Sequence, residues 1–169
     1  MSERVQLVVA GALAMLGIYG LMLRGWRNRQ RRQGFLPAPP LADGTATILI
    51  GATPGVFVGT TFAGRWLDRV AIHQLSDRAA GWLSVASDGV HIDREGAPEI
   101  FLPYDVLLDA APGDALAGKV MGPGGLLVLT WRLGPDELTS AFRATDHAQH
   151  VRLADAIRAL LPVATREAS

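Results

Sequence analysis

The chain of 169 residues and 18.0 kDa has room for one modest domain and an appendage, but it is too short for two full domains. It contains no cysteine, which excludes a disulfide framework, a thiol nucleophile and a cysteine-based zinc site. The formal net charge is zero, yet residues 1–34 carry six arginines against one glutamate (+5) and the remaining 135 residues carry ten basic and fifteen acidic side chains (−5). The whole-chain charge therefore hides two segments of opposite sign and by itself indicates neither a nucleic-acid binder nor an acidic tail protein.

The first expected element is an apolar segment, residues 5–23, whose only polar side chains are Gln6 and Tyr19. As a helix it would span about 28 Å, close to the ~30 Å hydrocarbon core of a bilayer. A cleaved signal peptide is the alternative, but such peptides have a shorter apolar stretch and then a small-residue cleavage site. Here the apolar segment runs directly into Arg24 and Gly25. We therefore expect residues 1–33 to form a single transmembrane helix with its basic flank.

The basic flank that follows the apolar segment sets the expected orientation. It consists of Arg24, Arg27, Arg29, Arg31 and Arg32. Because the more positive side of a span stays in the cytoplasm, the N-terminus should face outward and the C-terminal 135 residues should be cytoplasmic, at the cell (inner) membrane. The flank could also attract anionic headgroups at about 1 kcal/mol per residue, although its role in topology already explains it.

The rest of the chain reads as short strands followed by one helix. Residues 34–44 contain three prolines and predict an extended linker. From residue 45 onward, apolar runs alternate with turn signals such as Ser87-Asp88-Gly89, a tight hairpin signal. Six or seven strands are expected among the runs 45–50, 55–60, 69–73, 82–86, 89–93, 99–102, 106–110, 125–133 and 138–143.

The period then changes from strand to helix. Asp146 is a candidate N-cap, and the apolar positions from Leu153 to Leu161 share one helical face until Pro162 ends it. The sequence therefore predicts a mainly β fold over residues 45–162. This fold would be a small antiparallel β-barrel or sandwich capped by a C-terminal α-helix, with residues 163–169 as a tail. The strand aromatics are expected to pack in its core: Phe57, Trp66, Trp82, Trp131 and Phe142.

Several short pieces occur in an order that is typical of one bacterial family. They are Val58-Gly59-Thr60-Thr61, Trp66-Leu67-Asp68-Arg69-Val70, Ala117-Gly118-Lys119-Val120, Leu127-Val128-Leu129-Thr130-Trp131 and Ala141-Phe142-Arg143. With the single N-terminal span and the total length, the chain resembles the membrane-anchored PH-like domain proteins of high-GC Gram-positive bacteria over nearly its whole length. The resemblance implies a PH-like fold and a membrane anchor. It implies no established activity, although some members carry a loose "transporter" or "export" label.

Motifs that would carry chemistry are incomplete. Residues Gly113 to Lys119 fit G-x-x-x-x-G-K, but Val120 replaces the Ser or Thr that would hold Mg²⁺, and a glycine- and proline-rich stretch follows where a helix is needed. His147 and His150 are three residues apart on the expected helix, without an evident third metal ligand. No serine nucleophile elbow or triad grouping stands out. We therefore expect no enzyme activity, no metal and no cofactor.

The expected partners follow from charge and from this lack of chemistry. The stretch 51–55, read as the first hairpin loop, has no Lys or Arg for polyanionic phosphates, and the domain is acidic. Tight phosphoinositide-type headgroup binding and nucleic-acid binding are therefore disfavoured. The candidate contact patch is Arg65, Trp66 and Arg69.

Three interpretations remain open. The leading one is a single-pass membrane protein that presents a cytoplasmic PH-like domain as a protein-interaction or scaffolding module for an unidentified protein partner. The alternatives are an accessory subunit of a membrane transport or export complex, and a nucleotide- or ligand-binding enzyme domain.

Overall fold

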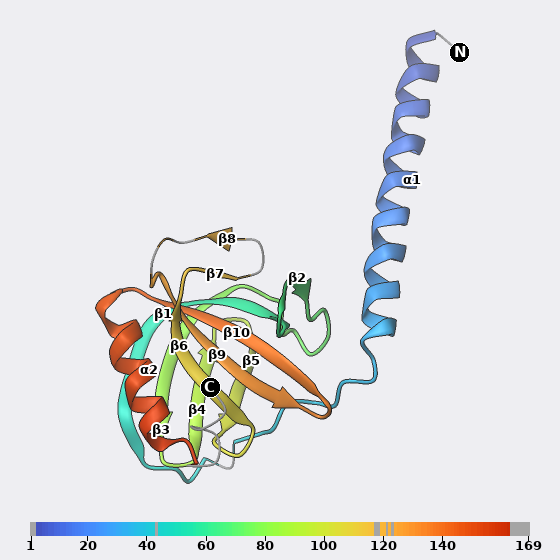
Figure 1. Ribbon diagram of the computed structural model, residues 1–169. Helices are drawn as coiled ribbons and strands as arrows, with labels where there is room; N and C mark the ends of the chain where they lie inside the picture. The colour runs from blue at the N-terminus through green and yellow to red at the C-terminus, as the bar shows by residue number, and fades with distance from the viewer. Residues whose placement is uncertain (1–2, 43, 117–118, 121, 123, 163–169) are drawn as a thin grey trace. The chain divides into compact units, whose positions relative to one another are not determined.

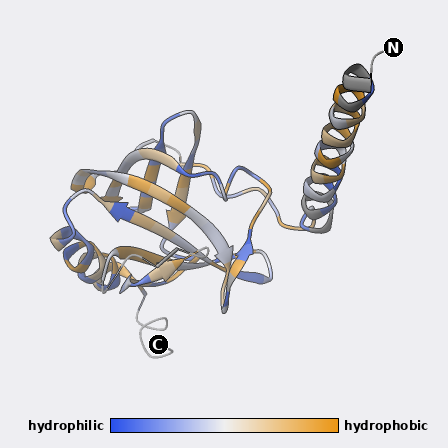
Figure 2. Ribbon diagram, turned by 90° about the horizontal axis from the view of Figure 1, so that it is seen from above, coloured by the Kyte–Doolittle hydropathy of each residue, from blue (hydrophilic) through white to orange (hydrophobic). Residues whose placement is uncertain are grey.

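The computed structural model describes residues 3–42, 44–116, 119–120, 122 and 124–162 (Figure 1). The chain divides into two compact units, Met1–Phe35 and Leu36–Ser169. The first unit is the helix α1, Glu3–Arg32, and within it Val8–Asn28 is long and apolar enough to cross a membrane. Hydrophobic colouring covers much of α1 in Figure 2. The helix extends beyond the predicted apolar segment because arginine and glutamine favour helix and the basic flank contains no proline.

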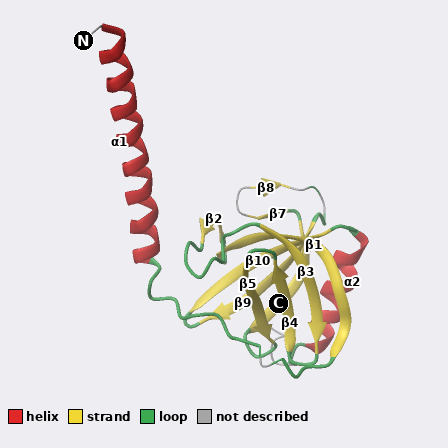
Figure 3. Cartoon of the chain, turned by 180° about the vertical axis from the view of Figure 1, so that it is seen from behind, coloured by secondary structure: helices red, strands yellow, loops and turns green. Residues whose placement is uncertain are grey.

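The second unit is an antiparallel sheet whose path runs in the order β5-β4-β3-β1-β10-β9-β6. Its strands are β1 Ile48–Phe62, β3 Ala79–Ala86, β4 Gly89–Arg94, β5 Ala97–Pro103, β6 Leu107–Gly113, β9 Leu126–Leu133 and β10 Asp136–Ala144. Short β2, Arg65–Arg69, pairs with β1, while β7, Ala115–Leu116, pairs with β8, Lys119–Val120. The helix α2, Ala148–Leu160, packs against β6, β9 and β10 (Figure 3). This arrangement confirms the predicted mainly β fold with a C-terminal helix.

The long strand β1 connects the two halves of the sheet. Its first part pairs with β3, its last part pairs with β10, and Gly55 lies opposite residues of both. The prediction of two separate strands joined by a hairpin loop at 51–55 is therefore wrong. Glycine and proline bend this strand instead of ending it, with register shifts between Ile48 and Ile50 and between Ile50 and Thr53.

Two further boundaries differ from the prediction. The expected strand at 69–73 is wrong, because β2 ends at Arg69 and a turn follows in which His73 and Gln74 both have φ of 54°. The helix α2 begins at Ala148, one residue later than the predicted cap Asp146 implied, with His147 at the N-cap. Asp146 still assists the helix start, since its Oδ1 accepts a hydrogen bond of 3.0 Å from the Ala148 N–H.

The main hydrophobic core lies inside the bent sheet. Phe57, Trp131 and Phe142 are fully buried there, as predicted, and Leu153 and Ile157 of α2 cover it. Leu36 is also part of this core, so the compact unit includes most of the segment expected to be a linker. Asp43 and the tail 163–169 lie outside the described residues.

A second, smaller cluster lies apart from the main core. It joins Val58 of β1, Leu126 of β9 and Ala141 of β10 to Leu116 of β7. The strand β7 therefore has a packing role. The strand β8 begins at Lys119, where a phosphate-binding loop would need the N-terminus of a helix.

Candidate functional site

The predicted contact patch lies on β2. The Arg65 guanidinium stands 4.6 Å from the centre of the Phe62 ring, and its Nη1 lies 3.5 Å from Oδ2 of Asp68. Arg69 donates a hydrogen bond of 3.4 Å from Nη1 to the Ser76 carbonyl. The side chain of Trp66 lies outside the described residues. Both arginines thus make contacts within the domain, and the patch stays a prediction.

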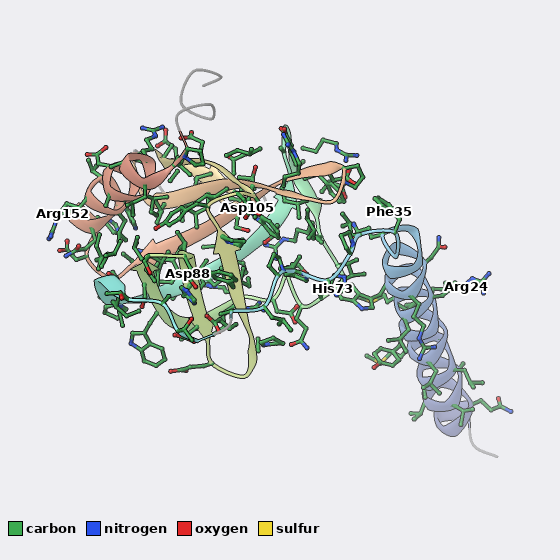
Figure 4. The ribbon with its side chains drawn as sticks, turned by 90° about the horizontal axis from the view of Figure 1, so that it is seen from below. Arg24, Phe35, His73, Asp88, Asp105 and Arg152 are labelled. Carbon is green, nitrogen blue, oxygen red and sulfur yellow. The ribbon has the colours of Figure 1, made fainter. Side chains whose placement is uncertain are left out.

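The basic flank lies on the last turns of α1. Arg24 and Arg27 are exposed, and Figure 4 shows the Arg24 side chain projecting away from the helix. The side chains of Arg29, Arg31 and Arg32 lie outside the described residues. Arg24 and Arg27 are therefore accessible to solvent.

Trp82 is an exposed aromatic side chain on the outer face of the sheet, so its predicted place in the core is wrong. Leu83 and Val85 of β3 point into the core, and strand alternation therefore directs Trp82 outward. Trp82 is 41% exposed. It lies directly between Pro54 of β1 and Asp93 of β4 in the strand register.

We call the surface formed by Pro54, Trp82, Asp93 and Glu95, all of them exposed, the Trp82 face. Glu95 belongs to this face because its main-chain N–H donates a hydrogen bond to the carbonyl of Ala80, which precedes Trp82 by two residues on β3. A shallow groove adjoins the face at Pro54, where β1 meets the start of α2. The groove is lined by Ala52, Thr53, Pro54, Thr145, Asp146 and Gln149.

Acidic residues dominate this half of the domain. Residues 77–105 contain six acids, namely Asp77, Asp88, Asp93, Glu95, Glu99 and Asp105, against Arg78 and Arg94. The Arg94 side chain is buried and donates hydrogen bonds to main-chain carbonyls. Its Nη1 lies 2.6 Å from the Gln74 oxygen, and its Nε lies 2.9 Å from the Pro98 oxygen. Its charge therefore stabilises the turn around Gln74 rather than the exposed acids.

His91 on β4 lies between two carboxylates. Its Nδ1 is 2.6 Å from Oε1 of Glu99, and its Nε2 is 3.0 Å from Oδ1 of Asp88. Burial, the largest single cause, lowers the pKa of His91. The hydrogen bonds that its ring makes to the carboxylates of Asp88 and Glu99, together with the negative charge of these groups, outweigh burial and raise the pKa above the ordinary value of 6.5. Both ring nitrogens lie within hydrogen-bond distance of a carboxylate oxygen, an arrangement that favours the doubly protonated form of His91. Within the described part of the chain, no three His, Cys, Asp or Glu side chains are grouped to hold a metal ion.

The raised pKa of His91 makes a testable prediction for stability. Because the folded state holds the proton more tightly, the stabilisation is fully present below pH ~6.5 and is lost as the pH rises through the raised pKa. We expect the difference in unfolding free energy between wild type and His91→Gln to be larger at pH 5.5 than at pH 8.5. Urea unfolding at several pH values measures it, with exposed His147→Gln as control. An equal difference at all these pH values would contradict the assignment.

His150 on α2 is fully buried. The Ala144 N–H donates to its Nε2 at 2.9 Å, so that nitrogen carries no proton. Its Nδ1–H therefore donates to the Gly124 carbonyl at 2.8 Å. Both nitrogens are occupied, so His150 does not form a metal pair with His147, whose ring stacks on it at 5.5 Å between centroids.

The surroundings of His150 favour its neutral form. Burial lowers the pKa of His150 from 6.5, and the nearby charges of His147 and Arg143 lower it further. The hydrogen bond to Gly124 and the charge of Asp146 act in the opposite direction but do not prevail. The neutral ring thus joins the end of β10 to the segment before β9.

Sequence reasoning missed Trp82, Arg94 and the His91 cluster as features of the domain. The alternation of Leu83 and Val85 with Trp82 was a signal that Trp82 faces outward. No sequence pattern indicates the role of Arg94, because its partners are the main-chain carbonyls of Gln74 and Pro98.

A seven-strand antiparallel path, bent at its long first strand and covered by a C-terminal helix, defines a PH-like domain, a class of generally non-catalytic binding modules. A family model described as bacterial PH domain-like matches residues 33–158, which is more than half of the chain. The chain belongs to this bacterial PH domain-like family. No curated protein matches it. The PH-like part of the resemblance is confirmed, while the membrane anchor and the bacterial group stay predictions.

Proposed function

We propose that the protein is a single-pass membrane protein that presents its PH-like domain in the cytoplasm as a non-catalytic protein-interaction module. The observation that carries this proposal is Trp82, which is 41% exposed on the outer sheet face beside the groove at Pro54. Exposed aromatic side chains are enriched among the residues that contribute most to binding at protein interfaces. The apolar helix α1 supports the anchor, and the arginines that follow its apolar part support a cytoplasmic domain.

The test is in-cell crosslinking and purification of the full-length protein beside a version that ends at Gly34. A protein captured by the full-length chain and lost from the shortened one is the expected result. A partner kept by both would contradict the proposal and move the function to α1, as expected for an accessory subunit of a membrane transport complex. A reporter fused at Ser169 tests the orientation, and an extracytoplasmic signal would overturn it.

A further inference from the structure

We propose that the Trp82 face binds an arginine-rich polypeptide segment of the partner protein. The inference rests on the proposed function as a protein-interaction module and adds the chemistry of the partner. Three features of the structure carry it: the placement of Trp82, the distribution of exposed charge around it, and the groove that continues the face toward α2.

The face has the extent of a short extended peptide. Pro54, Trp82 and Asp93 lie in one row across β1, β3 and β4. The groove lies at one end of this row, and β5 borders it at the other. Neighbouring strands are about 4.8 Å apart, so the distance from β10 to β5 is roughly 19 Å, which about six extended residues would cover.

The exposed charge on this face is negative. Asp93 and Glu95 are exposed, and no described cation forms an ion pair with either of them. Asp146 adds a carboxylate at the groove. Arg143 of β10 pairs with Val56 of β1, so it borders the Trp82 face on the side away from β4. A partner that covers Trp82 therefore meets carboxylates at both ends of the row.

Arginine fits this arrangement better than other cations. The face of an indole ring attracts a cation, and a planar guanidinium can stack on it while its N–H groups donate to neighbouring carboxylates. Trp82 and Asp93 are direct neighbours across two strands, so one arginine side chain could contact both. Phosphate-bearing lipids and nucleic acids would instead be repelled by Asp93 and Glu95.

The test measures binding of a fluorescent hexa-arginine peptide to the full-length protein in phosphatidylcholine nanodiscs. We expect binding that weakens at least tenfold in Trp82→Leu, which keeps an apolar side chain and removes the ring. We expect a similar loss in the double variant Asp93→Lys/Glu95→Lys. The double variant Glu137→Lys/Asp155→Lys makes the same change in net charge elsewhere on the surface and should retain the affinity.

The outcomes separate this inference from the proposed function. Unchanged peptide binding in Trp82→Leu and Asp93→Lys/Glu95→Lys would overturn the inference, as would an equal loss in the control double variant. A cellular partner that depends on the domain but is still captured by both Trp82-face variants would leave the proposed function standing and overturn the arginine-rich assignment. Thermal unfolding of each variant establishes that the loss of binding occurs in a folded domain.

Discussion

Gly55→Ala is expected to destabilise the PH-like domain by about 3 kcal/mol, whereas Gly51→Ala on the same strand should leave it as stable or slightly more stable. A Cβ at Gly55 would overlap the main-chain oxygen of Arg143 and lie 2.6 Å from Cζ of the Phe142 ring. A Cβ at Gly51 would meet nothing within 4 Å. The difference arises because Gly55 lies where β1 pairs with both β3 and β10.

Urea unfolding of the full-length protein in detergent micelles measures this effect, followed by tryptophan fluorescence, to which the buried Trp131 contributes. The matched substitution at Gly51 controls for the general effect of replacing glycine by alanine in β1. Equal midpoints for the two variants would show that β10 can move away from Gly55 and that the close approach is not essential.

Gly55 also shows where sequence reasoning reached its limit for the fold. Glycine and proline between residues 51 and 55 are local turn signals, and they led to the prediction of a hairpin loop. Whether such a segment ends a strand or bends it depends on pairing with β3 and β10, which lie far along the chain. The hairpin at Ser87-Asp88-Gly89 was predictable because its strands are adjacent in sequence and its turn chemistry is local.

The candidate site was less accessible to sequence reasoning than the fold. The alternation of side chains along β3 predicts that Trp82 points outward. The acidic residues around it could be placed only once the registers of β4 and β5 were known. Buried polar groups gave no periodic signal at all. His150 illustrates this, because its partners are main-chain groups of Gly124 and Ala144 on other segments.

His150→Ala is expected to destabilise the domain by about 2–4 kcal/mol at pH 7, because it leaves two buried main-chain groups without partners and opens a cavity. These groups are the Gly124 carbonyl and the Ala144 N–H. His147→Ala on the same helix is the matched control. It removes an exposed ring at an N-cap that makes no side-chain hydrogen bond, so it should change stability little.

The sign of the pH dependence distinguishes this role from simple packing. The lowered pKa of His150 means that the unfolded state binds the proton more readily, so this residue makes the domain lose stability as the pH falls below ~6.5. His91 has the opposite sign, because its raised pKa stabilises the folded state in acid. Without His150, the loss of stability that this residue causes in acid disappears, while the stabilisation by His91 remains. Between pH 7 and 5 the variant should therefore lose less stability than wild type. Parallel pH profiles for wild type and His150→Ala would show that burial does not lower the pKa of His150 in the folded state.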